Sequence, residues 1–549
     1  MIRRDAETRR HRDARTFAPT GRQMVARGKR SAAPGSNPKN DRRPEGTQDD
    51  CSVAHRTNQA TPRRLLRFLR SLARLQRAVK TAKVIQGRRF ACPWLLSLAP
   101  SGHLAHILAR LVVVSFLLCA SATAQQIGNP TTQQGVTIPR GTYAIRNARI
   151  VTLAGPDIEN GTVVIRDGKI DAVGTNVNVP AGAQTIEARG LTVYPGMMDA
   201  GTSLGLVEVG QGANGTVDTS EIGELNPNAK AIIAVNQHSA HIGVTRVDGV
   251  THAVTLPLGG LISGQAAIIN LVGTTPMEMA VVPYAALVIN YPRLGGRRGD
   301  FGPEQQAPDI SAAITAAERQ LDQIRKLLRD AESYGRAQDA YAKDSSLPRP
   351  DHNVVLESLV PYVRGERPVI LRADREAEMR GAIKFAEEMK LKPIILGGDD
   401  AWKIAGFLKE KNVPVILTGV LNLPLREDDA YDTQYENAAK LQKAGVRFCI
   451  STGNANEEVR TLPFHAGMAA AFGLPKDEAL KAVTLYPAQI MNVADRLGAI
   501  EKGKMANLVV TDGDLLEVRT HVRYLFIDGR QVPLTSRHTE LNDAFKNRK

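Results

Sequence analysis

The sequence predicts an α/β protein with a mainly parallel sheet, combined with a small β domain that both ends of the body build. Short apolar runs such as Pro368–Leu371 and Pro393–Leu396 alternate with segments of helical spacing such as Ile314–Leu328. Continuous apolar runs are typical of parallel strands that are buried on both faces. The pairs Asp167-Gly168 and Asp528-Gly529 each stand between alternating runs, and they predict β-hairpins in the small domain.

The formal net charge of +15 is concentrated at the start of the chain. Residues 1–124 carry 25 basic and 7 acidic side chains, whereas the remaining 425 residues carry 46 and 49. A nearly neutral body with interspersed charges has an ordinary soluble surface, so we exclude nucleic acid as a partner. Residues 1–105 are rich in arginine and poor in apolar residues, which predicts a disordered basic extension.

A secretory signal peptide is predicted over residues 106–124. Arg110 precedes an apolar run of roughly ten residues, and Ala122-Thr-Ala124 has the small residues of a cleavage site. The run is too short to span a bilayer, so we expect cleavage near Ala124, a periplasmic or secreted protein, and no transmembrane span in the mature chain. A signal normally begins a chain, so one interpretation of residues 1–105 is an over-long reading frame. The mature chain keeps only Cys449 and can form no internal disulfide.

The body divides into a central α/β domain and two flanking parts of one β domain. Residues 125–196 hold the first predicted β strands, residues 496–535 supply the second set, and residues 536–549 remain as a tail. Between them, residues 197–495 hold the alternation of strands and helices. This span fits a TIM-type (β/α)8 barrel, and a doubly wound open sheet is the alternative. A barrel carries its functional side chains after the carboxyl ends of its strands.

The junction of the two domains reads Gly190-Leu-Thr-Val-Tyr-Pro-Gly-Met-Met-Asp-Ala-Gly-Thr-Ser-Leu-Gly205. Pro195 and Gly196 predict a turn, because Pro195 fixes φ and Gly196 tolerates the positive φ that such a turn often needs. The segment resembles the opening of amidohydrolase barrels, where Pro-Gly-hydrophobic-Ile-Asp-Ala-His-Thr-His is usual. Near the C-terminus, Leu497-Gly-Ala-Ile-Glu-Lys-Gly-Lys-Met-Ala-Asn-Leu508 resembles the family's Gly-Ser-Ile-Glu-Pro-Gly-Lys-Asp-Ala-Asp-Leu. The sequence is therefore similar to the amidohydrolase superfamily, in its imidazolonepropionase-like branch.

The resemblance implies a TIM-type barrel with a small β-sandwich, and hydrolysis of non-peptide carbon–nitrogen bonds in compounds such as cyclic amides. It also implies a divalent metal, with zinc as the family expectation, that polarises a carbonyl group and supplies hydroxide. The family takes its ligands from His-x-His after the first strand, two later histidines and a final aspartate. The expected partner is a small-molecule substrate, and homo-oligomer formation stays open.

The chain departs from the family at the ligand positions. Neither end of Gly-Thr-Ser after the first strand is a strong ligand, and the family's Val-His-Ala-His strand ends here in Arg-Ala-Asp. The four positions that the resemblance assigns to ligands hold Gly201-Thr-Ser203, Arg372-Ala-Asp374, Gly397 and Gly453. We therefore expect the standard metal centre to be absent.

Other polar residues are candidates for a different centre. His238 and His241 are spaced about one helical turn apart, so they are weak candidates for metal ligands, with surface packing as the alternative. Asp374 and His465 are candidates for proton transfer. Arg372 could bind a carbonyl or carboxylate group, or pair with Asp374 to fill the former metal cavity. The remaining residues expected at the barrel mouth are Asp199, Gly201, Ser203, Gly397, Asp399, Asp400, Gly453 and Asn454.

Two functions follow from these observations. The first is an amidohydrolase with an atypical centre, in which Asp374 or His465 transfers protons and Arg372 binds substrate. The second is a catalytically inactive exported barrel that binds a ligand or serves as a scaffold. The sequence assigns no cofactor, and metal content together with amidase activity distinguishes the two functions.

Overall fold

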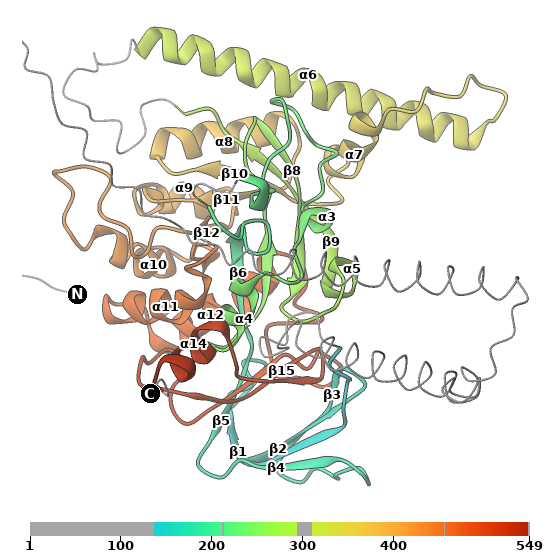
Figure 1. Ribbon diagram of the computed structural model, residues 1–549. Coiled ribbons are helices and arrows are strands. Elements are labelled where there is room, and N and C mark those ends of the chain that lie inside the picture. The colour runs from blue at the N-terminus through green and yellow to red at the C-terminus, as the bar shows by residue number, and fades with distance from the viewer. Residues whose placement is uncertain (1–136, 211–213, 294–309, 455, 547–549) are drawn as a thin grey trace, which may run out of the picture. The chain divides into compact units, whose positions relative to one another are not determined.

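The computed structural model describes residues 137–210, 214–293, 310–454 and 456–546. The predicted extension and signal peptide lie outside the described residues. Two eight-stranded sheets organise the described chain, one of them a nearly closed barrel and the other built from both ends of the body (Figure 1). Within these ranges, no helix has the length and apolar character needed to cross a membrane.

The barrel strands follow one another around the sheet in chain order. They are β6 (Met197–Thr202), β7 (Val250–Thr255), β8 (Ile262–Asn270), β9 (Ala280–Asn290), β10 (Val369–Ala373), β11 (Pro393–Gly397), β12 (Val415–Leu417) and β13 (Phe448–Ile450). Strands β9 to β13 run parallel, as do β6 and β7, whereas β8 is antiparallel to both of its neighbours. The predicted α/β barrel is confirmed. Its strands lie in chain order from β6 to β13, whereas the strand order of a doubly wound sheet reverses at a switch point.

The β7–β8–β9 region differs from the predicted alternation of parallel strands and helices. The apolar run Ala267–Val272 predicts a separate short strand, but its first four residues are the second half of a longer strand, β8, which forms antiparallel ladders with β7 and β9. Strand β9 contains Pro283, a residue that argues against a central strand because it cannot donate to a ladder. Pro283 lies at an irregularity of the β8–β9 ladder, beyond the residues that pair with β10. The proline is therefore accommodated where the pairing is already interrupted.

Helices surround the barrel and form its outer layer (Figure 1). The α-helices are α3 (Ala231–Ala234), α4 (Ala240–Arg246), α5 (Pro276–Met279), α6 (Ile310–Lys343), α7 (Val354–Val363), α8 (Glu376–Glu388), α9 (Ala405–Glu410), α10 (Thr433–Ala444), α11 (Leu462–Ala471), α12 (Lys476–Ala482), α13 (Leu485–Ile490) and α14 (Arg537–Lys546). Short 3-10 turns are η2 (Asn214–Thr216), η3 (Ala401–Ile404) and η4 (Val459–Thr461).

Alternation along the strands separates two apolar layers. On β10, Val369 and Leu371 belong to the cluster that the helices cover, whereas Ile370 belongs to the inner cluster with Ile394 and Ile416. Successive side chains of a strand point to opposite faces. The residue two positions after Ile370 therefore faces the barrel interior, which places Arg372 on the inner face at the carboxyl end of β10.

The second sheet combines strands from both ends of the body. Its strands are β1 (Tyr143–Ile150), β2 (Ile158–Arg166), β3 (Lys169–Gly174), β4 (Gln184–Glu187), β5 (Thr192–Pro195), β14 (Leu508–Thr511), β15 (Val522–Ile527) and β16 (Arg530–Val532). Strand β14 joins the two sets by pairing antiparallel with β5. The sheet surrounds its own apolar core, in which the Tyr143 and Phe526 rings meet edge to face with centroids 5.1 Å apart.

Both predicted Asp-Gly hairpins are present, and their turns contact each other. Asp167 and Gly168 have φ values of 52° and 82°, and Asp528 and Gly529 have 53° and 68°. Two consecutive positive φ angles are typical of the type I′ turn, which matches the twist of the strands. A Cβ atom on Gly529 would lie 2.6 Å from Gly168 Cα. Glycine is thus required at this contact for space as well as for conformation.

The predicted turn at Pro195-Gly196 is wrong in its geometry. Strand β5 ends at Pro195 and β6 begins at Met197, so the chain passes almost directly from one sheet to the other. Gly196 has no positive φ. It is needed instead because an added Cβ would overlap Thr251 Oγ1 of the neighbouring strand. Its N–H donates to the carbonyl of Asn507 (2.8 Å), whose side chain also contacts Asn270 of the barrel (2.8 Å).

Candidate active site

The candidate site lies where the parallel strands of the barrel end. Ser203 follows β6, Arg293 follows β9, Asp374 follows β10, and Asn454 follows β13. The carboxyl ends of parallel strands meet at one mouth of a barrel, which is where such barrels carry their functional groups. Sequence positions that are far apart are therefore brought to one edge of the sheet.

Asp199 joins the first barrel strand to the segment after the last one. Its carboxylate is fully buried and accepts hydrogen bonds from the N–H of Gly201 (3.1 Å), the N–H and Oγ1 of Thr452 (3.2 and 2.5 Å) and Oγ of Ser451. Strands β6 and β13 are the two ends of the hydrogen-bonded strand order. Burial raises the pKa of Asp199, and the four hydrogen bonds oppose that shift. Asp199 is thus part of the barrel wall and closes it.

At three glycines that the sequence resemblance places at ligand positions, neighbouring atoms lie close to where a side chain would begin. A Cβ on Gly201 would lie 2.7 Å from Leu396 Cδ1, and one on Gly397 would overlap the Asp374 carboxylate. Gly453 has a φ of +79°, and a Cβ there would lie 3.3 Å from Thr418 Cβ. A histidine or aspartate at these positions would require the neighbours to move.

The donor set at the mouth does not fit the divalent metal that the fold family implies. Among the described residues, no group of three or more His, Cys, Asp or Glu side chains is placed to hold a metal ion. The prediction that His238 and His241 share a helix is wrong, because α4 begins at Ala240 with Ser239 as its N-cap. His241 Nε2 is hydrogen bonded to the carbonyl of Glu208 at 2.9 Å. The described side chains at the mouth therefore do not supply the ligand set that such a metal needs.

Arg372 and Asp374 lie at the mouth but do not pair with each other. Arg372 donates from Nη2 to Asn454 Oδ1, and Ser203 Oγ donates to the Asn454 carbonyl (2.6 Å). Asp374 instead forms its ion pair with Arg293, at 3.4 Å. The expected internal Arg372–Asp374 pair is therefore corrected to an Arg293–Asp374 pair. The reason is that Arg293 follows the adjacent strand β9, while the guanidinium of Arg372 turns across the mouth to Asn454.

Burial shifts the pKa of both groups. It lowers the pKa of Arg372 to about 10, which still leaves the guanidinium charged at neutral pH. Burial raises the pKa of Asp374, while the nearby Arg293 lowers it. A carboxyl with a raised pKa is a stronger base once it is ionised, so Asp374 has the character of a proton-transfer group.

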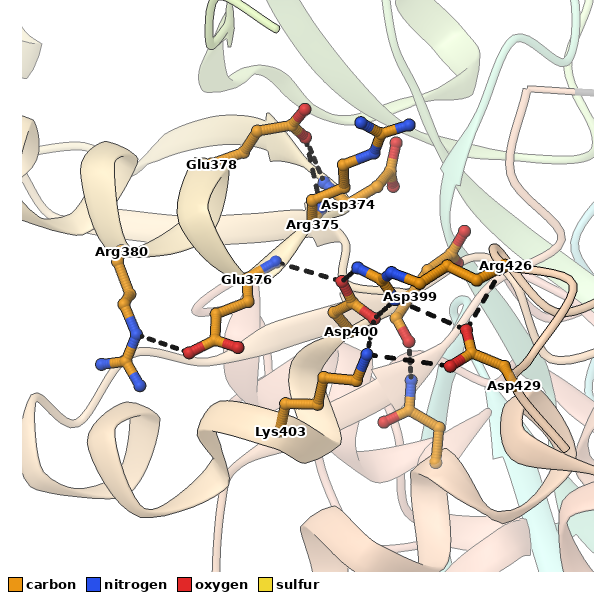
Figure 2. A network of polar contacts seen from close by, with 11 residues as sticks. Asp374, Arg375, Glu376, Glu378, Arg380, Asp399, Asp400, Lys403, Arg426 and Asp429 are labelled. Carbon is orange, nitrogen blue, oxygen red and sulfur yellow. Dashed lines mark hydrogen bonds and ion pairs between the residues drawn. The ribbon is translucent and has the colours of Figure 1, made fainter. Parts of the chain in front are cut away.

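Asp400 takes part in a structural ion-pair network beside the site. Its carboxylate accepts two hydrogen bonds from Arg426 (2.9 and 2.8 Å) and lies 3.1 Å from Lys403 Nζ, as Figure 2 shows. Although burial opposes it, these cations hold the pKa of Asp400 below its usual range. Asp399 is buried, and its carboxylate lies where a Cβ of Gly419 would be. The ion pairs of Asp400 with Arg426 and Lys403 therefore fix the segment after β11.

His465 lies on α11 and is 4 % exposed. Burial lowers its pKa to about 4, so the imidazole is neutral at neutral pH. Its Nδ1 atom has no hydrogen-bond partner in the described part of the chain. No hydrogen bond joins it to Arg372 or Asp374 within the described ranges. The geometry therefore favours Asp374 as the proton-transfer candidate.

Three residues of the site were missed from the sequence. Arg293 follows β9, a strand that the sequence does not predict because it contains Pro283. Ser451 and Thr452 follow β13 and bind Asp199, which is 252 and 253 positions away. The available signal was the pair of hydroxyl residues at the end of a predicted last strand, which in a closed barrel must meet the first strand.

Comparisons with known proteins agree with the fold. Residues 403–532 match the model of the amidohydrolase family. An imidazolonepropionase from Mesorhizobium japonicum is 25 % identical over 401 residues, which covers 67 % of this chain and 91 % of that protein. An adenine deaminase from Desulforamulus reducens is 24 % identical over 393 residues, 71 % of this chain and 57 % of that protein. The crystal structure of an amidohydrolase from Thermotoga maritima superimposes with a TM-score of 0.62 at 24 % identity, covering 71 % of this chain and 99 % of that one.

The barrel and its companion sheet therefore have the fold of an amidohydrolase, and the C-terminal part of the chain matches the amidohydrolase family. Imidazolonepropionases recur among the similar proteins, at 24–25 % identity over about two thirds of this chain.

The buried carboxylate of Asp199 provides a direct test of barrel closure. In Asp199→Asn, one carboxylate oxygen becomes an amide N–H₂ group. The single remaining carbonyl oxygen cannot accept all four hydrogen bonds, and the new N–H₂ group would face the N–H and hydroxyl donors that now bind the carboxylate. We expect the free energy of unfolding to fall by about 2–4 kcal/mol, measured by urea denaturation. The exposed Asp428→Asn is the matched control, with an expected change within about 0.5 kcal/mol. Equal stabilities of the two variants would contradict closure by Asp199.

Proposed function

We propose that the protein hydrolyses non-peptide carbon–nitrogen bonds in small cyclic amides, without the histidine-based metal centre of its family. The observation that carries this proposal is the placement of Asp374 beside Arg293, with Arg372 held by Asn454 at the same strand-end mouth. Membership of the amidohydrolase superfamily supports hydrolysis, and the names imidazolonepropionase and adenine deaminase support a cyclic nitrogen compound as substrate.

In the proposed reaction, the Asp374 carboxylate takes a proton from a water molecule. The water oxygen forms a bond to the carbonyl carbon, the carbon–nitrogen bond breaks, and the proton passes from Asp374 to the leaving nitrogen. Arg372 binds an oxygen of the substrate and fixes its orientation at the mouth. Arg293 holds the Asp374 carboxylate in place and keeps part of it ionised by lowering its pKa.

A second candidate is a catalytically inactive barrel that binds a small molecule or serves as a scaffold. The observation that favours it is the filling of the ligand positions, where Leu396 and Asp374 occupy the space beside Gly201 and Gly397. Under this alternative, Arg372 and Asp374 bind a ligand without turnover. Hydrolysis assays on purified protein separate the two candidates, because binding without turnover supports only the second.

The role of Asp374 predicts both a rate and a pH effect. Against any cyclic amide that is hydrolysed, Asp374→Asn should lower kcat by about 10²- to 10⁴-fold. A base works only when it is ionised, so kcat/KM should rise as the pH passes upward through the raised pKa of Asp374. Arg293→Gln removes a cation that lowers this pKa, and should move the acid limb to higher pH.

Asp428→Asn, on the exposed surface, should leave the pH profile unchanged. Full activity in Asp374→Asn, or an acid limb that moves to lower pH in Arg293→Gln, would contradict the assignment of the base.

We also propose that the protein is exported to the periplasm or secreted after cleavage near Ala124. The apolar run after Arg110 and the Ala-Thr-Ala sequence support this proposal, although they lie outside the described residues. N-terminal sequencing of the protein from its native host should give a start at Gln125. A mature chain that begins before residue 100 would contradict the signal-peptide interpretation.

A further inference from the structure

A small cavity opens at the end of the barrel opposite to the mouth. It lies where Arg447 and Phe448 lead into β13, whereas Ser451 and Asn454 of the mouth follow the end of the same strand. The C-terminal end of α10, the start of β13 and the helices α12 and α13 line the cavity, and its volume is about 240 Å³. The proposed reaction at the mouth does not use this cavity.

The wall of the cavity is mainly apolar and partly aromatic. The rings of Phe448 and Tyr486 meet edge to face with centroids 6.2 Å apart, and Val446 and Ile490 add aliphatic surface. A dry cavity of about 150 Å³ is enough to hold benzene, whereas drug-sized ligands fill about 300 Å³ or more. The cavity therefore has room for one aromatic ring with a small substituent.

The acidic side chain in the lining, Glu478, has its charge compensated. Its Oε1 atom accepts a hydrogen bond from Lys481 Nζ (2.8 Å), and its Oε2 atom accepts one from the hydroxyl of Tyr486 (2.6 Å). Burial raises the pKa of Tyr486 to about 12, and the hydrogen bond to Glu478 adds to that shift, so the phenol keeps its proton at neutral pH. The lining therefore presents no uncompensated negative charge.

Two cations border the cavity. Arg447 is part of the lining, and it donates from Nη2 to the carbonyl of Asn412 at 2.9 Å. The Nζ atom of Lys409 lies 2.9 Å from the position that a Cβ of Gly445, another residue of the lining, would take. Among the described residues, neither cation forms an ion pair with a carboxylate. A guanidinium group has five N–H donors, so Arg447 keeps donors for a ligand.

We propose that this cavity binds a small aromatic carboxylate. The ring packs against Phe448 and Tyr486, and the carboxylate binds Arg447 with Lys409 beside it. A neutral ring would leave the two cations uncompensated, and a small anion without a ring would leave the apolar wall in contact with water. This inference does not rest on the proposed function, because Arg372 and Asp374 lie at the other end of the barrel.

Isothermal titration of the purified protein with three matched compounds tests the inference. Benzoate has both the ring and the charge, benzyl alcohol has the ring alone, and acetate has the charge alone. We expect benzoate to bind about 10-fold more tightly than benzyl alcohol, as one charge-assisted hydrogen bond gives. It should bind about 10- to 100-fold more tightly than acetate, which buries no ring.

Two variants separate the contributions of charge and cavity. Arg447→Gln should remove the preference for benzoate over benzyl alcohol. Gln442→Phe adds a ring to the lining and keeps every charge, so it should abolish the binding of both aromatic compounds even if Arg447→Gln fails to fold. The matched control is Lys392→Gln, which removes an exposed cation just before β11, outside the lining. This control should bind benzoate as the unchanged protein does.

Equal affinity for benzoate and benzyl alcohol, or unchanged benzoate binding in Gln442→Phe, would overturn the inference. Loss of benzoate binding in Arg372→Gln together with its retention in Arg447→Gln would place the ligand at the mouth and would also overturn it. Vesicles of phosphatidylglycerol offer anionic groups on a membrane instead. Binding to such vesicles without any binding of benzoate would assign the cations to a membrane surface and contradict the small-molecule site.

Discussion

The hydrogen bonds that Asp199 accepts from Ser451 and Thr452 are the constraint on which the candidate site depends. They connect the first strand of the barrel to the segment that follows the last strand, where the ladder of backbone hydrogen bonds ends. That segment turns at Gly453 and places Asn454 beside Arg372. A buried carboxyl therefore does more than stabilise the wall, because it fixes the loop that orients the cation of the mouth.

Neighbouring side chains fill the space beside the glycines of the mouth. Where a side chain is missing, at Gly201 and Gly397, a neighbouring one occupies the space, from Leu396 and Asp374 respectively. Where the resemblance places a metal-binding histidine, Arg372 supplies a positive charge that remains fixed to the chain. Protein interiors are closely packed, so coordinated filling of this kind is expected when a cavity is no longer needed. The mouth thus carries a charge pattern that Arg293, Arg372 and Asp374 form.

Much of the fold could be predicted because it depends on local patterns. Continuous apolar runs marked most parallel strands, and the Asp-Gly pairs marked two turns whose positive φ angles need such residues. Strand β9 and helix α7 were missed because each contains a proline, Pro283 and Pro361, that argues against a regular element. The structure tolerates Pro283 at an interruption of the ladder, which no local pattern reveals.

The site was less predictable than the fold because its contacts join distant segments. The positions of Arg372 and Asp374 after a strand could be expected from the family resemblance, but their partners could not. Arg293 lies 81 positions from Asp374, and Asn454 lies 82 positions from Arg372. The closing of the barrel decides which of several charged groups form ion pairs. From the sequence alone, Arg372 could therefore bind a carbonyl group, bind a carboxylate or pair with Asp374.

The metal content of the purified mature protein tests most directly the claim that the ligand positions no longer form a metal centre. Zinc, manganese and iron should each remain far below stoichiometric amounts after dialysis, as measured by inductively coupled plasma mass spectrometry. A strong chelator should leave both the unfolding temperature and any amide hydrolysis unchanged. A stoichiometric divalent metal whose removal abolishes hydrolysis or lowers the unfolding temperature would contradict the account.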